Sequence, residues 1–336
     1  MEKVLIVGPS WVGDMVMAQA LFKLIKSRHP NCTIDVLAPA WSLPILERMP
    51  EVNRGIALGL GHGILGIKER KALGHSLRTE QYSHSITLPR SWKSALAPYF
   101  ANAKIRTGFV GEQRYGLLND WRKLDKKTLD QTVKRYLALG LNPDEKLADI
   151  QWEYPKLTAN PDNLKQLQNN LKLDLERPAV ALMPGAEYGP AKQWPLEYFQ
   201  KLAEVLTEKG YQVWVLGSQK DKPAGDIICQ NQNPFTYNLC GQTQLADTVD
   251  LLSHAQHAVS NDSGLMHVAA AVGTKVHALY GSSSPDYTPP LTDNKVIHYL
   301  NLSCSPCFER VCPLGHTNCL KHIYWGLVLK GILIDN

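Results

Sequence analysis

The sequence predicts an α/β protein made of two doubly wound domains. Short apolar runs typical of buried parallel strands alternate with stretches of helical spacing, and this alternation stops near the middle of the chain and then restarts. A length of 336 residues suits two domains of ordinary size. With 44% hydrophobic and 20% charged residues, the composition is that of a globular protein rather than a disordered or fibrous one.

The first domain opens on a strand-like run at 4–7, which ends at Gly8. Apolar residues then recur at helical spacing over 15–25, and a second strand is expected at 33–37, so these segments form a β–α–β unit. The same alternation predicts two further strands and two further helices in this domain, the strands at 85–88 and 104–108 and the helices at 92–100 and 131–139.

Residues 142–177 interrupt the alternation and are rich in proline, which predicts a linker and one polar helix. We therefore expect a first domain at 1–160 and a second at 161–336. The second domain has four predicted strands, three predicted internal helices and a helix at its C-terminus; the strands are at 179–183, 212–216, 258–260 and 276–280, and the internal helices at 196–209, 246–255 and 265–272.

Charge is divided unevenly along the chain. Residues 1–150 hold 22 basic and 14 acidic side chains, a net charge of +8, whereas residues 151–336 hold 14 and 17, a net charge of −3. The excess is sharpest over 62–136, with 15 basic and 6 acidic residues. A basic first domain indicates an anionic partner, either nucleic acid, a membrane surface or a phosphorylated substrate, although a solvated basic surface is the simpler alternative.

The sequence disfavours a nucleic-acid partner and predicts a cytoplasmic protein. Its basic residues are not interleaved with an aromatic platform, and it has no recognisable DNA-reading motif. Because no apolar run approaches the roughly 20 residues that cross a bilayer, we expect neither a membrane span nor a signal peptide. Seven cysteines, an odd number in a chain of this size, favour a reducing compartment over a secreted disulfide scaffold.

Loops that follow strands are the candidate sites, because ligands of doubly wound folds bind at the carboxyl ends of the strands. The first such loop runs from Gly8 to Asp14. Asp14 is either a helix cap or a general base that accepts a proton from a substrate hydroxyl. The loop lacks the glycine spacing of a dinucleotide fingerprint, which disfavours a nicotinamide cofactor.

Two loops of the second domain are suited to phosphate. Lys192 lies on a Gly/Pro-constrained loop after Gly185 and just before a helix, although a lone surface lysine is often only solvated. Residues 260–267 place Asp262, Ser263 and Gly264 at the junction of a strand and a helix, with His267 one turn later. The helix start favours an anion such as a diphosphate; the alternative is that Asp262 or Ser263 caps the helix and His267 packs beneath it.

The chain resembles glycosyltransferase family 9. The stretches that carry the resemblance occur in the family's order over most of the chain: GPSWVGDMVMAQ, APAW, MPEVN, LGHG, LGHSLR, RTGF, RYGLLND, PGAEYGPAKQWP, SNDSGLMHVAAA and ALYGSSSPDYTPPL. The resemblance implies a GT-B fold, in which two Rossmann-like doubly wound domains face each other across a cleft. The first domain would bind the acceptor and the second the sugar nucleotide.

The resemblance also implies the reaction. This is transfer of L-glycero-D-manno-heptose from ADP-heptose to the first heptose of the lipopolysaccharide inner core, heptosyl-Kdo2-lipid A, with inversion and without a cofactor. Another acceptor, either Kdo2-lipid A itself or the outer core, is the alternative. By position, Asp14 matches the base. Lys192, Asp262, Ser263, Gly264 and His267 match the donor-binding residues, to which we add Gly185, Gly217, Ser218 and Thr243.

The basic first domain then has a candidate partner in the carboxylates and phosphates of a Kdo-lipid A-type acceptor, with peripheral contact to the cytoplasmic face of the inner membrane. The residues expected to bind the acceptor are Ser10, Trp11, Gly13, Arg90, Lys93, Arg106 and Arg114.

Four of the seven cysteines fall within one short segment, at positions 304, 307, 312 and 319, with His316 and His322 nearby. The two-residue spacing between Cys304 and Cys307 suits a metal ion, and four thiolates would complete a structural zinc site. An iron–sulfur cluster or simply reduced, packed thiols are the alternatives, since the later spacings match no standard zinc finger. No metal is expected in the catalytic reaction itself.

Overall fold

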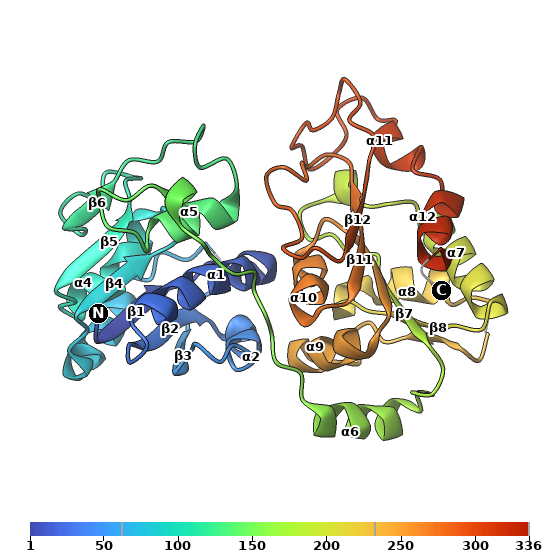
Figure 1. Cartoon of the computed structure of the whole chain (residues 1–336), viewed down its shortest axis with the longest axis horizontal. Coiled ribbons are helices and arrows are strands. Elements are labelled where there is room, and N and C mark those ends of the chain that lie inside the picture. Colours follow the sequence, from blue (N-terminus) through green and yellow to red (C-terminus); the bar gives the residue numbers. More distant parts are fainter. Residues whose placement is uncertain (62, 232, 335–336) are drawn as a thin grey trace. The chain divides into compact units, whose positions relative to one another are not determined.

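The structure, a computed structural model, describes residues 1–61, 63–231 and 233–334. His62 of the LGHG stretch lies outside the described residues, as do Gln232, Asp335 and Asn336. The chain divides into two compact units, Met1–Lys156 (unit 1) and Leu157–Asn336 (unit 2). Each unit is a parallel sheet with helices on both faces, so the predicted α/β class with two Rossmann-like domains is confirmed (Figure 1).

Unit 1 contains a six-stranded parallel sheet in the order β3-β2-β1-β4-β5-β6. Its strands are β1 (Lys3–Val7), β2 (Thr33–Pro39), β3 (Arg54–Leu58), β4 (His84–Thr87), β5 (Ile105–Phe109) and β6 (Asp120–Arg122).

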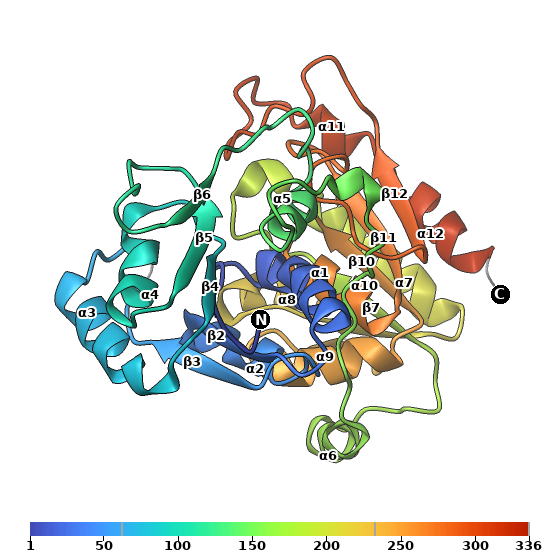
Figure 2. The same cartoon turned by 60° about the vertical axis from the view of Figure 1, so that its left-hand side comes forward.

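Helices cover both faces of the unit 1 sheet. Figures 1 and 2 show α1 (Val12–Arg28) and α5 (Thr132–Ala138) on one face, and α3 (Ile67–Ser76) and α4 (Leu96–Phe100) on the other. The short α2 (Leu43–Leu46) packs beside β3. Single 3₁₀ turns complete the unit, at η1 (Ala40–Ser42), η2 (Arg78–Glu80), η3 (Trp92–Ala95) and η4 (Leu147–Asp149).

Unit 2 repeats the same topology. Its parallel sheet has the order β12-β11-β10-β7-β8-β9, so the first strand of each unit lies between the second and the fourth. The strands are β7 (Ala179–Met183), β8 (Gln212–Val215), β9 (Thr236–Asn238), β10 (His257–Asn261), β11 (Lys275–Tyr280) and β12 (Lys295–Tyr299).

The helices of unit 2 likewise form two layers (Figure 1). One contains α6 (Pro161–Leu171), α9 (Leu245–His254) and α10 (Gly264–Val272), and the other α7 (Leu196–Glu208), α8 (Lys222–Ile228) and α12 (Trp325–Leu333). The remaining elements are α11 (Asn318–Lys321), η5 (Pro190–Lys192) and η6 (Gln219–Asp221). No helix in the described part of the chain is both long and apolar enough to cross a lipid bilayer.

The strand order places the candidate loops. In each unit the chain reverses its direction of winding between the first and fourth strands, that is, between β1 and β4 and between β7 and β10. The loops that leave the carboxyl ends of such a strand pair diverge to opposite faces of the sheet and leave a crevice. The loops of Asp14, Lys192 and Asp262 all start from these strands.

Three buried histidines form a row across β10, β11 and β12. His277 lies in the middle, with Nε2 3.2 Å from His257 Nδ1 and Nδ1 3.5 Å from His298 Nε2. Helix α12 passes close by, because a Cβ on its Gly331 would lie only 3.1 Å from a ring carbon of His277. Burial lowers the pKa of His298 to about 4, so this imidazole is neutral at physiological pH.

We expect this row to make the fold acid-sensitive. An unfolded histidine takes up a proton near pH 6.5, whereas His298 does so only near pH 4, so its contribution to stability is lost as the pH falls through that window. One such proton changes the free energy of unfolding by up to about 1.4 kcal/mol per pH unit. Replacing His298→Gln should therefore flatten the pH dependence measured by denaturant unfolding between pH 7 and 4.5.

The control is His322→Gln, which alters an exposed imidazole and should leave the slope unchanged. Equal slopes for the parent chain and His298→Gln would contradict the assignment.

Candidate active site

A buried ion pair lies at the crevice of unit 2. Lys192, at the end of η5 after β7, places its Nζ 2.5 Å from Oδ2 of Asp262, which directly follows β10. The Lys192 side chain is 17% exposed and that of Asp262 only 5%. The two loops predicted to bind a phosphate are thus joined to each other through their charged side chains.

Asn261, which the sequence analysis did not single out, braces this arrangement. Its Nδ2 donates to the carbonyl of Pro184 at 2.7 Å, and its Oδ1 accepts from the backbone N–H of Trp194 at 3.0 Å. One buried amide therefore holds both ends of the loop that carries Lys192. The indole of Trp194 is itself buried and donates to the carbonyl of Ile323 at 2.8 Å.

Helix α10 starts without a side-chain cap. Ser263 is its N-cap residue in extended conformation, but its side chain makes no capping hydrogen bond and lies 3.3 Å from the hydroxyl of Ser260. The alternative that Ser263 caps the helix is therefore not seen, and Asp262 is paired with Lys192 instead. The first-turn N–H groups of α10 carry the positive end of the helix dipole toward this crevice.

His267 is buried beneath this helix start. Burial lowers its pKa to about 4, an effect that Asp262 opposes and Lys192 reinforces, so the imidazole is neutral near pH 7. Its Nδ1 has no hydrogen-bond partner within the described residues, nor do the buried hydroxyls of Thr243, Ser282 and Ser283. Buried polar atoms are rarely left unpaired, so these four are candidates for contact with a ligand. The two serines were not predicted as site residues.

Gly185 and Gly217 are explained by close packing around one carboxylate. A Cβ on Gly185 would lie 2.6 Å from an oxygen of Asp221, and one on Gly217 would lie 2.8 Å from its Cβ. Asp221 in turn accepts hydrogen bonds from the N–H and the hydroxyl of Ser218, both at 2.8 Å. These glycines bring the β7 and β8 loops together around Asp221.

In unit 1, Asp14 lies in the first turn of α1, where the exposed N–H groups of a helix favour a carboxylate. It is half-buried, next to the buried Gly13. Trp11 is the N-cap residue of the helix and is 49% exposed. Trp41, which is 46% exposed, donates its indole N–H to the carbonyl of Ser10 at 3.2 Å. The loop that leads into Asp14 therefore carries one exposed indole and is contacted by a second.

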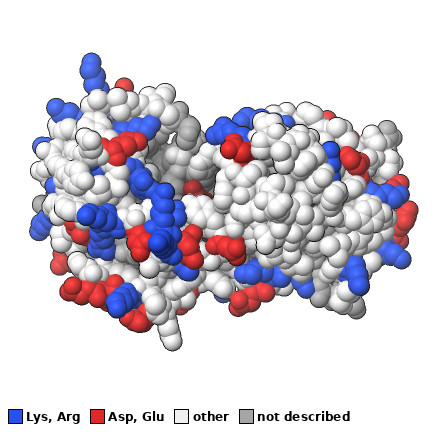
Figure 3. Space-filling view, turned by 90° about the horizontal axis from the view of Figure 1, so that it is seen from above, with Lys and Arg blue, Asp and Glu red and all other residues white. Residues whose placement is uncertain are grey.

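The basic residues predicted to bind the acceptor differ in solvent exposure and in how far they are already hydrogen-bonded within unit 1. Arg90 is exposed, and Lys93 is half-buried with its Nζ 3.2 Å from the carbonyl of Ile64. Arg106 already donates to the carbonyls of Leu117 and Ala103, at 2.8 and 2.9 Å. On the face drawn in Figure 3, the Lys and Arg atoms of unit 1, at the left, gather in several groups.

Arg114 requires a correction, because it does not lie at the surface. It is 1% exposed, and its guanidinium donates to the carbonyls of Phe109, Pro89 and Ser91 at 2.7, 2.8 and 3.1 Å. Burial lowers its pKa to about 10. The side chain therefore fixes the loop on both sides of Arg90 instead of contacting an acceptor itself.

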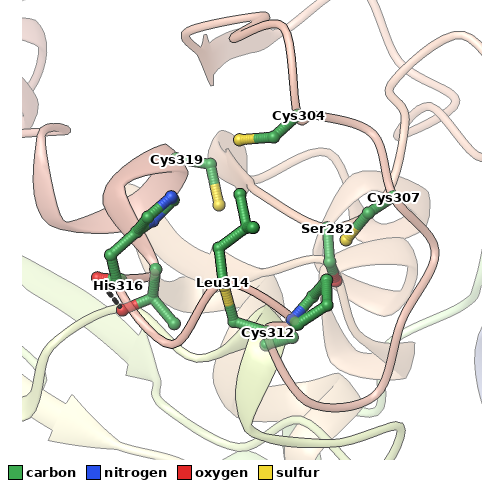
Figure 4. Close-up of a pocket in the computed structure, with 10 residues that line it drawn as sticks. Ser282, Cys304, Cys307, Cys312, Leu314, His316 and Cys319 are labelled. Carbon is green, nitrogen blue, oxygen red and sulfur yellow. Dashed lines mark hydrogen bonds between the residues drawn. The ribbon is translucent and has the colours of Figure 1, made fainter.

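The four clustered cysteines line one small cavity together with Ser282, Leu314 and His316 (Figure 4). All seven cysteines of the chain are unpaired thiols. In the described residues, no three His, Cys, Asp or Glu side chains are arranged as they stand to hold a metal ion.

Comparison with known proteins identifies the family. The model of glycosyltransferase family 9 (heptosyltransferase) matches residues 70–318. The chain belongs to glycosyltransferase family 9. The family predicted from the sequence is confirmed, and the chain is accordingly a glycosyltransferase.

Individual members of the family are also similar. The lipopolysaccharide heptosyltransferase 2 of Salmonella typhimurium is 48% identical over 300 residues, 86% of each chain. The lipooligosaccharide heptosyltransferase 2 of Haemophilus influenzae is 48% identical over 304 residues, 88% of this chain and 87% of that one. The structure of Escherichia coli ADP-heptose lps heptosyltransferase II superposes with a TM-score of 0.89 at 42% identity, covering 99% of this chain and 98% of that one.

We expect the loss of Arg114 to destabilise this family 9 chain far more than the loss of Arg90, because Arg114 is buried and Arg90 is exposed. Arg114→Met removes a buried guanidinium and leaves several carbonyls unpaired, which should lower the free energy of unfolding by about 3 kcal/mol. The matched change Arg90→Met, at an exposed residue of the loop that Arg114 holds, should cost less than about 0.5 kcal/mol. Denaturant unfolding of both variants checks this, and comparable losses would refute the buried role.

Proposed function

We propose that this glycosyltransferase transfers L-glycero-D-manno-heptose, with inversion, from ADP-heptose to the first heptose of the lipopolysaccharide inner core. The observation that carries the proposal lies at the strand ends of unit 2, where Lys192 pairs with Asp262 at the uncapped start of α10, with the buried His267 in the same helix. Thr243, Ser282 and Ser283, like His267, each have a buried polar atom with no partner among the described residues. This is a site for an anionic ligand with further polar groups. The names of the similar proteins, heptosyltransferases 2 and II, support the choice of sugar and acceptor.

Lys192 and α10 would bind the diphosphate of the donor. As ADP departs, negative charge accumulates on its phosphate oxygens, and a lysine and a helix N-terminus stabilise that charge. The carboxylate of Asp262 would repel a phosphate, so we assign it to holding Lys192 in position. Since these groups supply the positive potential, we propose that the reaction requires no cofactor.

The remaining donor contacts are assigned by their unpaired atoms and their place at the strand ends. Thr243, Ser282 and Ser283 offer buried hydroxyls, and the neutral His267 offers Nδ1. Hydrogen bonds to the donor would pair all four groups. Gly185, Gly217, Ser218, Ser263 and Gly264 complete the proposed set, as residues that shape the loops around the donor.

Asp14 would act as the general base. In an inverting transfer a carboxylate takes the proton of the attacking hydroxyl while that oxygen bonds to the anomeric carbon, opposite the departing ADP. Asp14 is half-buried in the first turn of α1, at the end of the loop that follows β1.

The acceptor would bind to unit 1 beside Asp14. Ser10, Trp11 and Gly13 precede the base on its own loop and helix start, Arg90 lies on the loop after β4, the strand next to β1, and Lys93 lies in the η3 turn that follows. These two cations would bind carboxylates or phosphates of a Kdo-lipid A-type acceptor. Because that acceptor is anchored in lipid, the chain would work in peripheral contact with the cytoplasmic face of the inner membrane, without a nucleic-acid partner.

The acceptor is tested by presenting two lipids to the full chain with ADP-heptose. Kdo2-lipid A and its mono-heptosylated form, each embedded in phospholipid vesicles, should differ: only the mono-heptosylated lipid should gain a heptose by mass spectrometry. In the same mixtures, part of the chain should sediment with the vesicles.

Transfer only to Kdo2-lipid A would favour the alternative, a first-heptose enzyme. Transfer to neither would overturn both assignments, and a chain that never sediments with the vesicles would overturn the membrane contact.

Asp14 and Lys192 should be distinguishable by kinetics. Asp14→Asn keeps the shape but cannot accept the proton, so kcat should fall by about 100-fold or more while the KM for ADP-heptose stays close to its original value. Lys192→Met removes a charged contact with the donor, so the KM for ADP-heptose should rise by about tenfold or more.

The control is Lys220→Met, on a neighbouring loop, where an exposed lysine pairs with the exposed Glu187. Its kinetics should be unchanged. Asp14→Asn with full turnover would remove the base assignment, and Lys192→Met with an unchanged donor KM would remove the phosphate contact.

A further inference from the structure

The segment 300–317, between β12 and α11, has too little apolar burial to explain its order. It contains no helix or strand, and Ser305 is its sole buried residue. Several of its large apolar side chains are largely exposed, with Phe308, Val311 and Leu314 exposed by 49%, 67% and 61%. Ordering each residue costs about 1–2 kcal/mol in backbone entropy, and long irregular segments in compact domains generally carry a function or a cross-link.

This segment nevertheless lies against two loops that hold proposed donor-site residues, the Lys192 loop and the loop after β11 that begins at Gly281. The carbonyl of Phe308 accepts from the hydroxyl of Tyr188 at 2.6 Å, and its N–H donates to the carbonyl of Ser282 at 2.6 Å. The N–H of Ala191, the residue before Lys192, donates to the carbonyl of Arg310 at 3.0 Å. The conformation of the segment therefore helps to set the position of Lys192.

The backbones of segment 300–317 and the Lys192 loop also pack closely against each other. Gly189, with φ of +153°, would place a Cβ only 2.5 Å from the carbonyl oxygen of Arg310. On the other side, the hydroxyl of Ser305 donates to the carbonyl of Gly281 at 2.5 Å. These contacts require a fixed backbone conformation of segment 300–317, although the segment buries too few apolar side chains to fix that conformation by itself.

The thiols of Cys304, Cys307 and Cys312 in this segment and that of Cys319 in α11 line one cavity (Figure 4). The cavity has room for at least one metal ion or one water molecule. The chain turns tightly at one of the thiols, because the N–H of Gly315 donates to the carbonyl of Cys312 at 3.1 Å. Such a turn presents a sulfur to the centre of the cavity.

We propose that Cys304, Cys307, Cys312 and Cys319 bind one divalent metal ion, zinc or iron, and that this ion orders segment 300–317 against the Lys192 loop. The two-residue spacing of the first pair and a set of four sulfurs suit tetrahedral thiolate coordination. Binding converts four thiols to thiolates, releases their protons to solvent, and draws the side chains inward from positions in which they do not yet form a metal site. Metal coordination thus supplies the cross-link that orders the segment in place of apolar burial, and the ion takes no part in glycosyl transfer.

Metal analysis of the full chain tests this directly. Protein purified without chelator from cells supplied with zinc and iron should hold about one ion per chain, and elemental analysis distinguishes the two metals. Cobalt(II) added to the reduced, metal-stripped chain should give the intense thiolate charge-transfer absorption of a tetrahedral site. Removing the ion should expose segment 300–317 to limited proteolysis and raise the KM for ADP-heptose several-fold.

The double variant Cys304→Ser/Cys307→Ser should lose the ion and the cobalt spectrum, and Cys229→Ser, a thiol outside the segment, should keep both. If the double variant fails to fold, the cobalt titration of the parent chain still decides. Less than about 0.1 ion per chain together with no cobalt–thiolate band would overturn the proposal and leave reduced, packed thiols as the alternative. Neither readout depends on ADP-heptose, so failure of the proposed function would not be mistaken for failure of the metal site.

Discussion

The contact between Lys192 and Asp262 is the constraint on which the geometry of unit 2 depends. A carboxylate with only 5% of its surface exposed is costly unless a cation and hydrogen bonds compensate for lost water. The neighbouring positions of β7 and β10 in the sheet bring that cation within reach. Asn261 then ties the same loop to the end of β10, so the lysine is held before any ligand arrives. Such preorganisation reduces the entropy that a diphosphate would lose on binding.

The central strands were predictable, whereas the edge strands were not. Strands such as β7 are buried on both faces and therefore read as continuous apolar runs. The strands at the sheet edges, β3, β6, β9 and β12, were missed. Each is only partly buried, and Arg54 in β3 and Asp120 in β6 break the apolar pattern. Helix positions were predicted well where apolar spacing was regular, as in α7 and α10.

The candidate site was predictable as a set of loops but not as a set of contacts. Gly, Asp and Lys after strands identified the chain segments, because backbone approach and charge have clear residue signatures. Which polar atoms remain unpaired depends on packing, so the polar strand end that holds Ser282 and Ser283 gave only an unspecific signal in the sequence. Asn261 could have been found, since a polar residue that ends a buried strand must satisfy its amide there.

Arg114 shows why a net charge of +8 is not a surface property. Its positive charge was predicted to belong to the acceptor-binding groups. Its guanidinium instead donates hydrogen bonds to backbone carbonyls inside unit 1. The guanidinium of Arg106 likewise donates hydrogen bonds to two backbone carbonyls. The two units therefore handle anions by different means. Unit 2, with a net acidic composition, concentrates a local positive potential from one lysine and one helix start, and a domain's total charge does not reveal such a site.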